Sequence, residues 1–214
     1  MTDRTWPSIV TSQPRTTGAP TKGGTMRPED STNHKPPIIT VRVSVPCTAS
    51  PDAIYNVLAD LNSHLVWAGE QSPDKHFRLL TMEGGPTAAT VGDRFSSRGA
   101  NMGSMIFADS SVVVEADPGT RFGFDTESVL ERRYRPNWHA RFANRYTITR
   151  DGNGSVLGYT CQVWPQNYVP FWLHPLMRPL TRVMVPRAIR KNMENLAALA
   201  EAAGRAQPDG ENAM

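Results

Sequence analysis

Long hydrophobic runs are missing from this sequence. No apolar stretch reaches the roughly 18 residues that a membrane-spanning helix needs. The N-terminal segment also lacks the apolar core of a signal peptide. We therefore expect a cytoplasmic protein.

Cysteine is scarce as well. The chain has two cysteines, Cys47 and Cys161, which lie far apart in the sequence and inside apolar segments. Because neither belongs to a CxxC pair, a zinc site built on cysteine is not expected. In a reducing cytosol such residues behave as small buried hydrophobic groups, so we predict two free thiols rather than a disulfide.

Charge of one sign is not concentrated anywhere in the sequence. The formal net charge is +3, and acidic and basic residues are interspersed. Nucleic-acid binding favours a basic patch with interleaved aromatic residues, and no such patch is present. We therefore expect no nucleic-acid partner.

Several catalytic motifs are absent too. The sequence has no GxSxG, GxGxxG or P-loop motif, which removes support for hydrolase, dinucleotide and nucleotide chemistry. His34, His76 and His174 share no spacing typical of metal ligands. We therefore expect neither a metal nor a cofactor.

Composition divides the chain into a folded part and two tails. Residues 1–37 are rich in Thr, Pro, Gly and charge, with few apolar residues to bury. Such a segment cannot offset its own ordering entropy, so we predict a disordered N-terminal tail. Residues 38–203 are predicted to form one domain, and residues 204–214 a second disordered tail.

The clearest helical pattern lies near the C-terminus, at residues 185–203. Pro186 suits a first helical turn, and Gly204 is typical of a helix end. The apolar residues recur at steps of four, four, three and four, which places them on one stripe that must be buried. They are Val185, Ile189, Met193, Leu196 and Ala200.

The rest of the domain is predicted to be mostly strands. Ser50 and Pro51 open a helix that ends near Asp60, and a second short helix or turn carries Trp67. Consecutive strands joined by tight turns indicate an antiparallel sheet. The predicted strands are residues 38–45, 76–82, 93–98, 104–115, 121–129, 138–150 and 155–164.

This element order resembles the helix-grip layout of the START-like superfamily, also called SRPBCC or Bet v 1-like. The segment TASPDAIYNVLADL (residues 48–61) is similar to the opening of its polyketide cyclase/dehydrase branch. VGDRFSSRGANMG (91–103) and VVVEADPGTRFGF (112–124) resemble a strand with its Gly-rich turn and the central hairpin of that branch. The resemblance covers about residues 38–203. It implies an α+β fold in which a curved antiparallel sheet of about seven strands wraps around a long C-terminal helix.

The same resemblance implies a cavity between sheet and helix that takes hydrophobic or aromatic small molecules. Relatives include lipid carriers, hormone sensors, aromatases and cyclases, and no catalytic set can be transferred residue by residue. We therefore expect a carrier or sensor of a lipid or polyketide-like molecule. The alternative is a polyketide cyclase, dehydratase or aromatase that uses acid–base groups in the cavity.

Alternating residues suggest which side chains face the ligand. In residues 138–150, Trp138, Phe142 and Tyr146 share one face, whereas His139 and Arg141 occupy the other. The alternative is a filled core, and a register slip of one residue would reverse the assignment. The predicted lining residues are Trp67, Phe95, Phe107, Phe122, Phe124, Trp138, Phe142, Tyr146, Ile189, Met193 and Leu196.

Four polar residues are candidates for chemistry. Asp109 either faces inward, where burial raises its pKa and makes it a general base, or faces water as an ordinary residue. The enzyme hypothesis needs an inward pair, such as Asp109 with Arg98 or Tyr146. His64 either enters the cavity mouth or lies on the surface.

One further segment suggests a surface contact. Phe171, Trp172, Arg178 and Arg182 combine aromatic and basic side chains. Such a combination favours weak docking on a membrane surface or a gate over the cavity. The alternative is that the segment packs over the end of the sheet. The sequence leaves open whether the protein is a monomer or a homodimer.

Overall fold

The computed structural model describes residues 36–70, 77–101, 105–131, 137–166 and 180–206. Contacts group them into one unit of the chain, residues 35–214. None of the helices described there is long and apolar enough to span a membrane.

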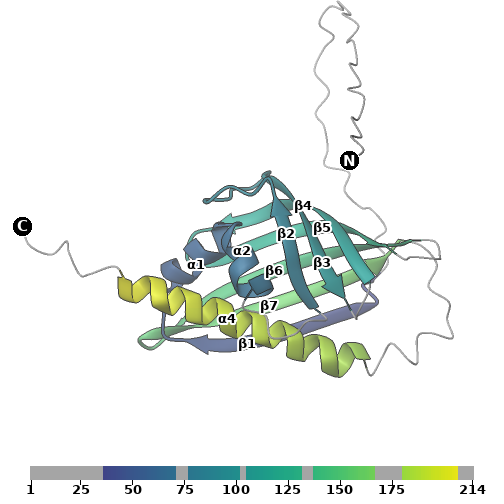
Figure 1. The fold of residues 1–214 in the computed structure, drawn as a ribbon. Helices are drawn as coiled ribbons and strands as arrows, with labels where there is room; N and C mark the ends of the chain where they lie inside the picture. The colour runs from purple at the N-terminus through teal and green to yellow at the C-terminus, as the bar shows by residue number, and fades with distance from the viewer. Residues whose placement is uncertain (1–35, 71–76, 102–104, 132–136, 167–179, 207–214) are drawn as a thin grey trace, which may run out of the picture. The chain divides into compact units, whose positions relative to one another are not determined.

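Seven strands form a single curved antiparallel sheet (Figure 1). Their order across the sheet is β1-β7-β6-β5-β4-β3-β2, so β1 and β2 are the edges. The strands are β1 (Ile39–Cys47), β2 (Phe77–Glu83), β3 (Arg94–Asn101), β4 (Met105–Asp117), β5 (Arg121–Glu131), β6 (Trp138–Asp151) and β7 (Gly154–Pro165).

Helices cover one face of this sheet. After β1 come α1 (Pro51–Ala59), α2 (Ser63–Leu65) and a π-helical turn, η1 (Val66–Glu70). A second π-helical turn, η3 (Leu180–Met184), leads into the long helix α4 (Val185–Ala206). Ser50 caps α1 as predicted, since its Oγ accepts a hydrogen bond from the Ala53 amide at 3.2 Å.

We call the covered side the inner face of the sheet. On β1 it carries Val41, Val43, Val45 and Cys47, which are buried while the residues between them are exposed. Strand pairing extends this face from β1 through β7 and β6 to β5, β4, β3 and β2. The core therefore lies between this face and the helices.

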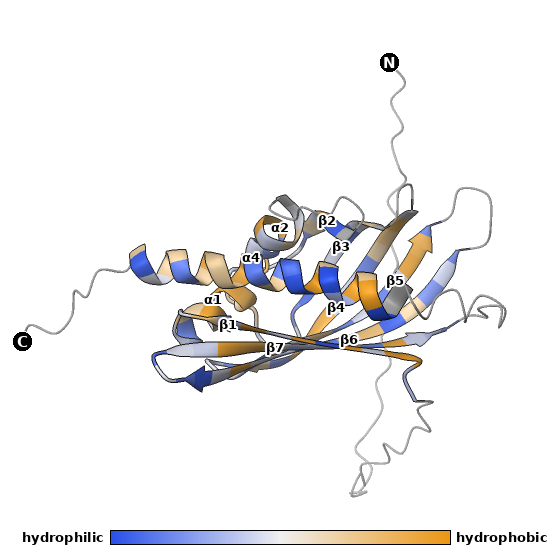
Figure 2. Ribbon diagram, turned by 90° about the horizontal axis from the view of Figure 1, so that it is seen from below, coloured by the Kyte–Doolittle hydropathy of each residue, from blue (hydrophilic) through white to orange (hydrophobic). Residues whose placement is uncertain are grey.

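Helix α4 packs against β1, α1 and η1 along its apolar stripe. Met193 and Leu196 are at most 1% exposed, and Figure 2 shows hydrophobic and hydrophilic residues alternating along the helix. Cys47 Sγ donates to the Ala197 carbonyl at 3.6 Å, and the Thr48 amide donates to Glu201 Oε1 at 2.7 Å. These contacts fix α4 on the sheet, and the α+β helix-grip fold expected from the sequence is confirmed.

Several strands are longer than the sequence suggests. β1 continues through Pro46, which is tolerated because β1 is an edge strand and needs fewer backbone donors. β3 continues through Gly99, where a Cβ would lie 3.3 Å from the Arg78 carbonyl oxygen of the neighbouring strand. The predicted strands end one residue earlier in each case, at Val45 and Arg98.

The predicted helix end at Gly204 is wrong. α4 continues to Ala206, Gly204 keeps a helical backbone, and a Cβ there would meet no atom within 4 Å. Gly204→Ala is therefore expected to raise the free energy of unfolding by up to about 1 kcal/mol, because alanine loses less backbone entropy in a helix. Urea denaturation of both proteins measures this. A glycine that ended the helix with a positive φ would instead make the alanine variant less stable.

Candidate functional site

A row of polar side chains crosses the inner face of the sheet. Tyr159 Oη on β7 donates to Asn144 Oδ1 on β6 at 2.6 Å, and Asn144 Nδ2 donates to Thr126 Oγ1 on β5 at 3.4 Å. Thr126 Oγ1 lies 2.9 Å from Ser111 Oγ on β4, with either hydroxyl able to donate. Ser111, Thr126 and Asn144 are each less than 10% exposed. Four adjacent strands thus share one buried hydrogen-bonded row.

Asp109 belongs to the same face. It lies directly opposite Ser128 in the β4–β5 pairing, one inner-face pair along from Ser111 and Thr126. Of the two interpretations that the sequence left open, the structure therefore has Asp109 facing inward. Burial raises the pKa of its carboxyl group, and the nearby Ser128 hydroxyl offsets only part of that rise.

Ser128 is itself unusual. Its side chain is 3% exposed, and its Oγ has no hydrogen bond of full geometry within the described part of the chain, although the Asp109 carboxyl faces it closely enough for the hydroxyl to lower the pKa of Asp109. Its inner-face neighbour on β6 is Ala140, which offers no polar side chain. A buried hydroxyl without a partner is unfavourable in a folded protein unless another polar group meets it.

Arg98 and Tyr146, the partners expected for Asp109, do not lie beside it. Ser97 is the β3 residue paired with Asp109, so the next residue, Arg98, points to the outer face. There Arg98 Nη2 forms an ion pair with Glu131 Oε2 at 2.7 Å. Tyr146 pairs with Phe122, six residues from Ser128 along β5, which corresponds to about 20 Å.

Most of the predicted lining aromatics pack against one another beneath the short helices. Phe124 lies at the centre, with its ring centroid 5.3 Å from Phe95 and 6.3 Å from Phe122 and Tyr146. Trp67 on η1 closes this group from above and is 5% exposed. At this end of the inner face the aromatic side chains form filled core.

His64 joins this aromatic group, so its interpretation as a surface residue is wrong. It is 4% exposed, its Nε2 lies 2.8 Å from the Leu58 carbonyl oxygen, and its ring is 4.8 Å from that of Trp67. Burial lowers the pKa of His64 to about 4, against weaker opposing effects of Leu58 and Asp60. The imidazole is therefore neutral near pH 7 and donates to the carbonyl.

The opposite end of the inner face is packed less completely. Phe107 and Phe142 meet edge to face with ring centroids 6.5 Å apart, and both are only partly buried. Trp138 and Asp109 are partly buried as well. Asp109 and Ser128 lie between the Phe107–Leu130 pair and the Ser111–Thr126 pair, so aromatic and polar groups meet here.

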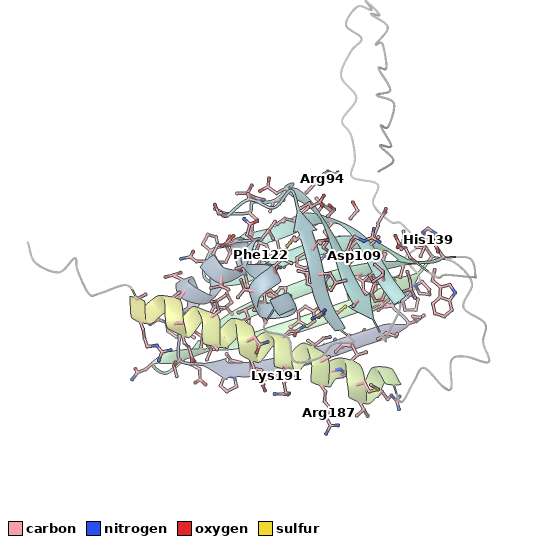
Figure 3. The ribbon with its side chains drawn as sticks, in the orientation of Figure 1. Arg94, Asp109, Phe122, His139, Arg187 and Lys191 are labelled. Carbon is pink, nitrogen blue, oxygen red and sulfur yellow. The ribbon has the colours of Figure 1, made fainter. Side chains whose placement is uncertain are left out.

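The predicted residues of α4 divide in the same way. Met193 and Leu196 are fully buried in the core, whereas Ile189, nearer the start of the helix, is partly buried. Arg187 and Lys191 are exposed, and their side chains project below α4 in Figure 3.

Two further buried polar atoms have no partner among the described residues. They are Trp67 Nε1 on η1 and Asn192 Oδ1 on α4. The two elements are in contact, since Asn195 Nδ2 donates to the Trp67 carbonyl at 3.1 Å. Unsatisfied polar atoms thus occur on the sheet, on η1 and on α4, the three elements that enclose the interior.

Positive charge on the sheet is directed outward. Arg141 and Arg145 on the outer face bind Asp125 at 2.9 and 2.6 Å. Burial alone would raise the pKa of Asp125, but these two arginines outweigh it and hold the pKa below its usual range. Arg150, which has inner-face parity, is exposed at the β6–β7 hairpin. No described inner-face position on β3–β6 between Phe95 and Tyr146 is a lysine or arginine.

A pocket of about 280 Å³ lies elsewhere, at the C-terminal end of α4, and Thr48, Glu201 and Arg205 are among its lining residues. The Glu201 carboxylate already accepts from the Thr48 amide, which lowers the pKa of Glu201.

Cys47 and Cys161 are both buried and free, as predicted. Within the described ranges no group of three or more His, Cys, Asp or Glu residues is placed to hold a metal ion.

The polar row was missed in the sequence. Thr126, Ser128 and Asn144 alternate with outer-face residues in the same strands as Phe122 and Phe142, and Ser111 lies four residues after Phe107. Period-two alternation from these aromatics would have found them. The inner face was assigned from its aromatic residues, because these bury the most surface.

The surface segment mostly lies outside the described residues. This applies to Phe171, Trp172 and Arg178. Arg182 belongs to η3 and is exposed. Docking of this segment on a membrane surface remains a prediction.

Residues 39–201 match the family described as polyketide cyclase / dehydrase and lipid transport. The chain belongs to this family. It is thereby part of the START-like (SRPBCC) superfamily that the sequence motifs suggested. A search of curated proteins found no match to this sequence.

Solved structures agree with the fold. A protein from Rhizobium loti is 17% identical, with a TM-score of 0.53 over 75% of this chain and 96% of the other. A protein from Rhizobium leguminosarum is 11% identical, with a TM-score of 0.54 over 77% and 95%. The di-domain ARO/CYC protein StfQ from the steffimycin biosynthetic pathway is 16% identical, with a TM-score of 0.51 over 77% and 51%. At these identities the similarity establishes the fold alone.

Proposed function

We propose that this family member binds a hydrophobic or aromatic small molecule between the inner face of the sheet and α4, as a carrier or sensor. The observation that supports this most is the partly buried stretch where Asp109 and Ser128 lie beside Phe107 and Phe142. Aromatic rings with a few polar groups among them are typical of small-molecule sites. The family, described as including lipid transport, also supports it.

The two ends of the inner face have different roles in this proposal. The tightly packed aromatic group around Phe124 holds α1, α2 and η1 on the sheet and is not expected to move aside for a ligand. Phe107, Trp138 and Phe142 retain exposed surface that a ligand would bury. Covering one such aromatic side chain contributes roughly 1.5–3 kcal/mol.

The ionisable groups of the inner face favour binding over turnover. Tyr146 and Tyr159 have pKa values raised by burial, and burial raises the pKa of the Cys161 thiol to about 11. These groups remain protonated near pH 7, so they can donate hydrogen bonds but cannot act as bases. Asp109 is left without a second acid–base group from the predicted set.

Acid–base catalysis by Asp109 is the second candidate function. It is favoured by one observation, the inward carboxyl group whose pKa is raised by burial. Such a group exchanges protons with a bound keto compound more readily near neutral pH than an exposed aspartate does. If Asp109→Asn retains ligand binding but loses turnover of a poly-β-keto substrate, the enzyme hypothesis holds; unchanged turnover contradicts it.

The binding proposal is tested with ligands and one matched pair of variants. Native mass spectrometry of the protein purified from its own host is expected to show a retained small molecule. In a thermal-shift screen of fatty acids, sterols and aromatic polyketides, one class is expected to raise the melting temperature, since a ligand at 100 times its Kd adds about 2.7 kcal/mol of stability.

The variants locate the site. Phe142→Ala is expected to weaken binding at least tenfold, because Phe142 contacts Phe107 on the inner face. Trp164→Ala is the control, since Trp164 pairs with Arg141 on the outer face and should bind as the wild type does. Equal weakening by both variants, or no ligand from any class, would contradict the proposal.

A further inference from the structure

The chemical class of the ligand follows from the charges around Asp109, if the proposed binding function holds. We infer that the buried end of the ligand is an uncharged hydroxyl or carbonyl group, and that the site rejects carboxylates and phosphates. The inference rests on one carboxyl group and one buried hydroxyl facing each other, with no lysine or arginine at the described inner-face positions around them.

The two polar groups are placed to meet one ligand oxygen. Asp109 and Ser128 are directly opposite on adjacent antiparallel strands, where Cβ atoms lie about 4.5–5.5 Å apart. Ser97 adds a second hydroxyl from β3, in register with Asp109. The Ser128 hydroxyl, which faces the Asp109 carboxyl, can both donate and accept. A ligand hydroxyl or carbonyl oxygen can therefore complete the hydrogen bonding of Ser128.

A negatively charged ligand group would meet no counter-ion among the inner-face residues that the structure describes on β3–β6. The next inner-face polar groups are Ser111, Thr126 and Asn144, which are neutral and already bonded to one another. Three arginines described on the neighbouring strands, Arg98, Arg141 and Arg145, point to the outer face and form ion pairs with acidic residues there. Burying an unpaired anion is strongly unfavourable, and an ionised Asp109 would add repulsion.

A neutral oxygen suits both protonation states of Asp109. An ionised Asp109 accepts a hydrogen bond from a ligand hydroxyl, and a protonated Asp109 donates one to a ligand carbonyl. Burial favours the protonated form by raising the pKa of Asp109. The same burial disfavours a ligand ammonium group, which would require an ionised partner.

Three probes with the same ring system and different charges test the inference: 2-naphthol, 2-naphthoate and 2-naphthylmethylammonium. Isothermal titration calorimetry at pH 7.5 is expected to give at least tenfold tighter binding of 2-naphthol than of either ion. In Asp109→Asn, which removes the carboxyl charge and keeps its shape, 2-naphthoate should gain at least fivefold while 2-naphthol changes less than threefold.

Glu127→Gln is the matched control. Glu127 is exposed and adjacent in sequence to Ser128, but it points to the outer face, so its loss should leave the ratio of the probes unchanged. Equal or tighter binding of either ionic probe to the wild type overturns the inference but leaves the proposed function intact. Binding of no probe, with no molecule retained in native mass spectrometry, contradicts the proposed function itself.

Discussion

Phe122→Ala is expected to lower the free energy of unfolding by about 3–5 kcal/mol, the range for removing a fully buried phenylalanine. Phe122 is 0% exposed, and its ring lies within 6.4 Å of the rings of Tyr55, His64 and Phe124. These neighbours come from α1, α2 and β5 itself, so they cannot collapse together into the space that alanine leaves. Guanidinium chloride denaturation followed by circular dichroism measures the loss.

Phe107→Ala is the comparison that makes this prediction specific. Phe107 carries the same side chain on the same face but is only partly buried. Its removal is expected to lower the free energy of unfolding by about 1–2 kcal/mol, because less apolar surface returns to water. Equal losses in the two variants would show that the inner face is packed uniformly, contrary to the division between a filled end and a partly open end.

Acidification from pH 7 to pH 4 is expected to destabilise the wild type by about 3 kcal/mol more than a His64→Gln variant. His64 has a pKa of about 4 in the folded protein against 6.5 in an unfolded chain. The unfolded state therefore binds the proton first. The stability that neutral His64 provides is complete above pH 6.5 and is lost as pH falls toward 4. At about 1.4 kcal/mol per tenfold change, the whole gap corresponds to about 3.5 kcal/mol. About 3 kcal/mol of this is lost by pH 4, where folded His64 is half protonated.

Urea denaturation at several pH values measures this difference. Glutamine keeps an N–H group for the Leu58 carbonyl and cannot gain the proton, so its stability profile should be flatter between pH 6.5 and 4. His139→Gln is the control because it makes the same substitution at an exposed position on the outer face of β6. Parallel profiles for wild type and His64→Gln would show that His64 is not buried in solution.

The strand and helix order was predictable because burial imposes a clear period. β6 alternates with Phe142, Tyr146 and Ile148 on one side and Arg141 and Arg145 on the other, and the structure has those faces as expected. The stripe of α4 was equally regular. The ends of the elements were harder to predict. β1 continues through Pro46 and α4 continues through Gly204, although proline and glycine often end such elements.

The polar part of the site was not predictable in the same way. Asp109 shares its face with Phe107, two residues before it, and a bulge between Val113 and Glu115 separates both from the apolar alternation further along β4. The residues around Asp109, Ala-Asp-Ser-Ser, carry no hydrophobic alternation of their own, so the sequence left its face open. The pairing of Ser128 with Asp109 is a property of two strands together, so it needed coordinates.

The contact between α4 and β1 has a consequence for how the domain folds. Cys47 and Ala197, which meet there, are separated by 150 positions along the chain. Contacts of such long range slow folding, because chain entropy is lost before the contact forms. During synthesis, the apolar side of β1 cannot be covered by α4 until α4 has left the ribosome. Until then Val41, Val43 and Val45 are available to chaperones or to wrong partners.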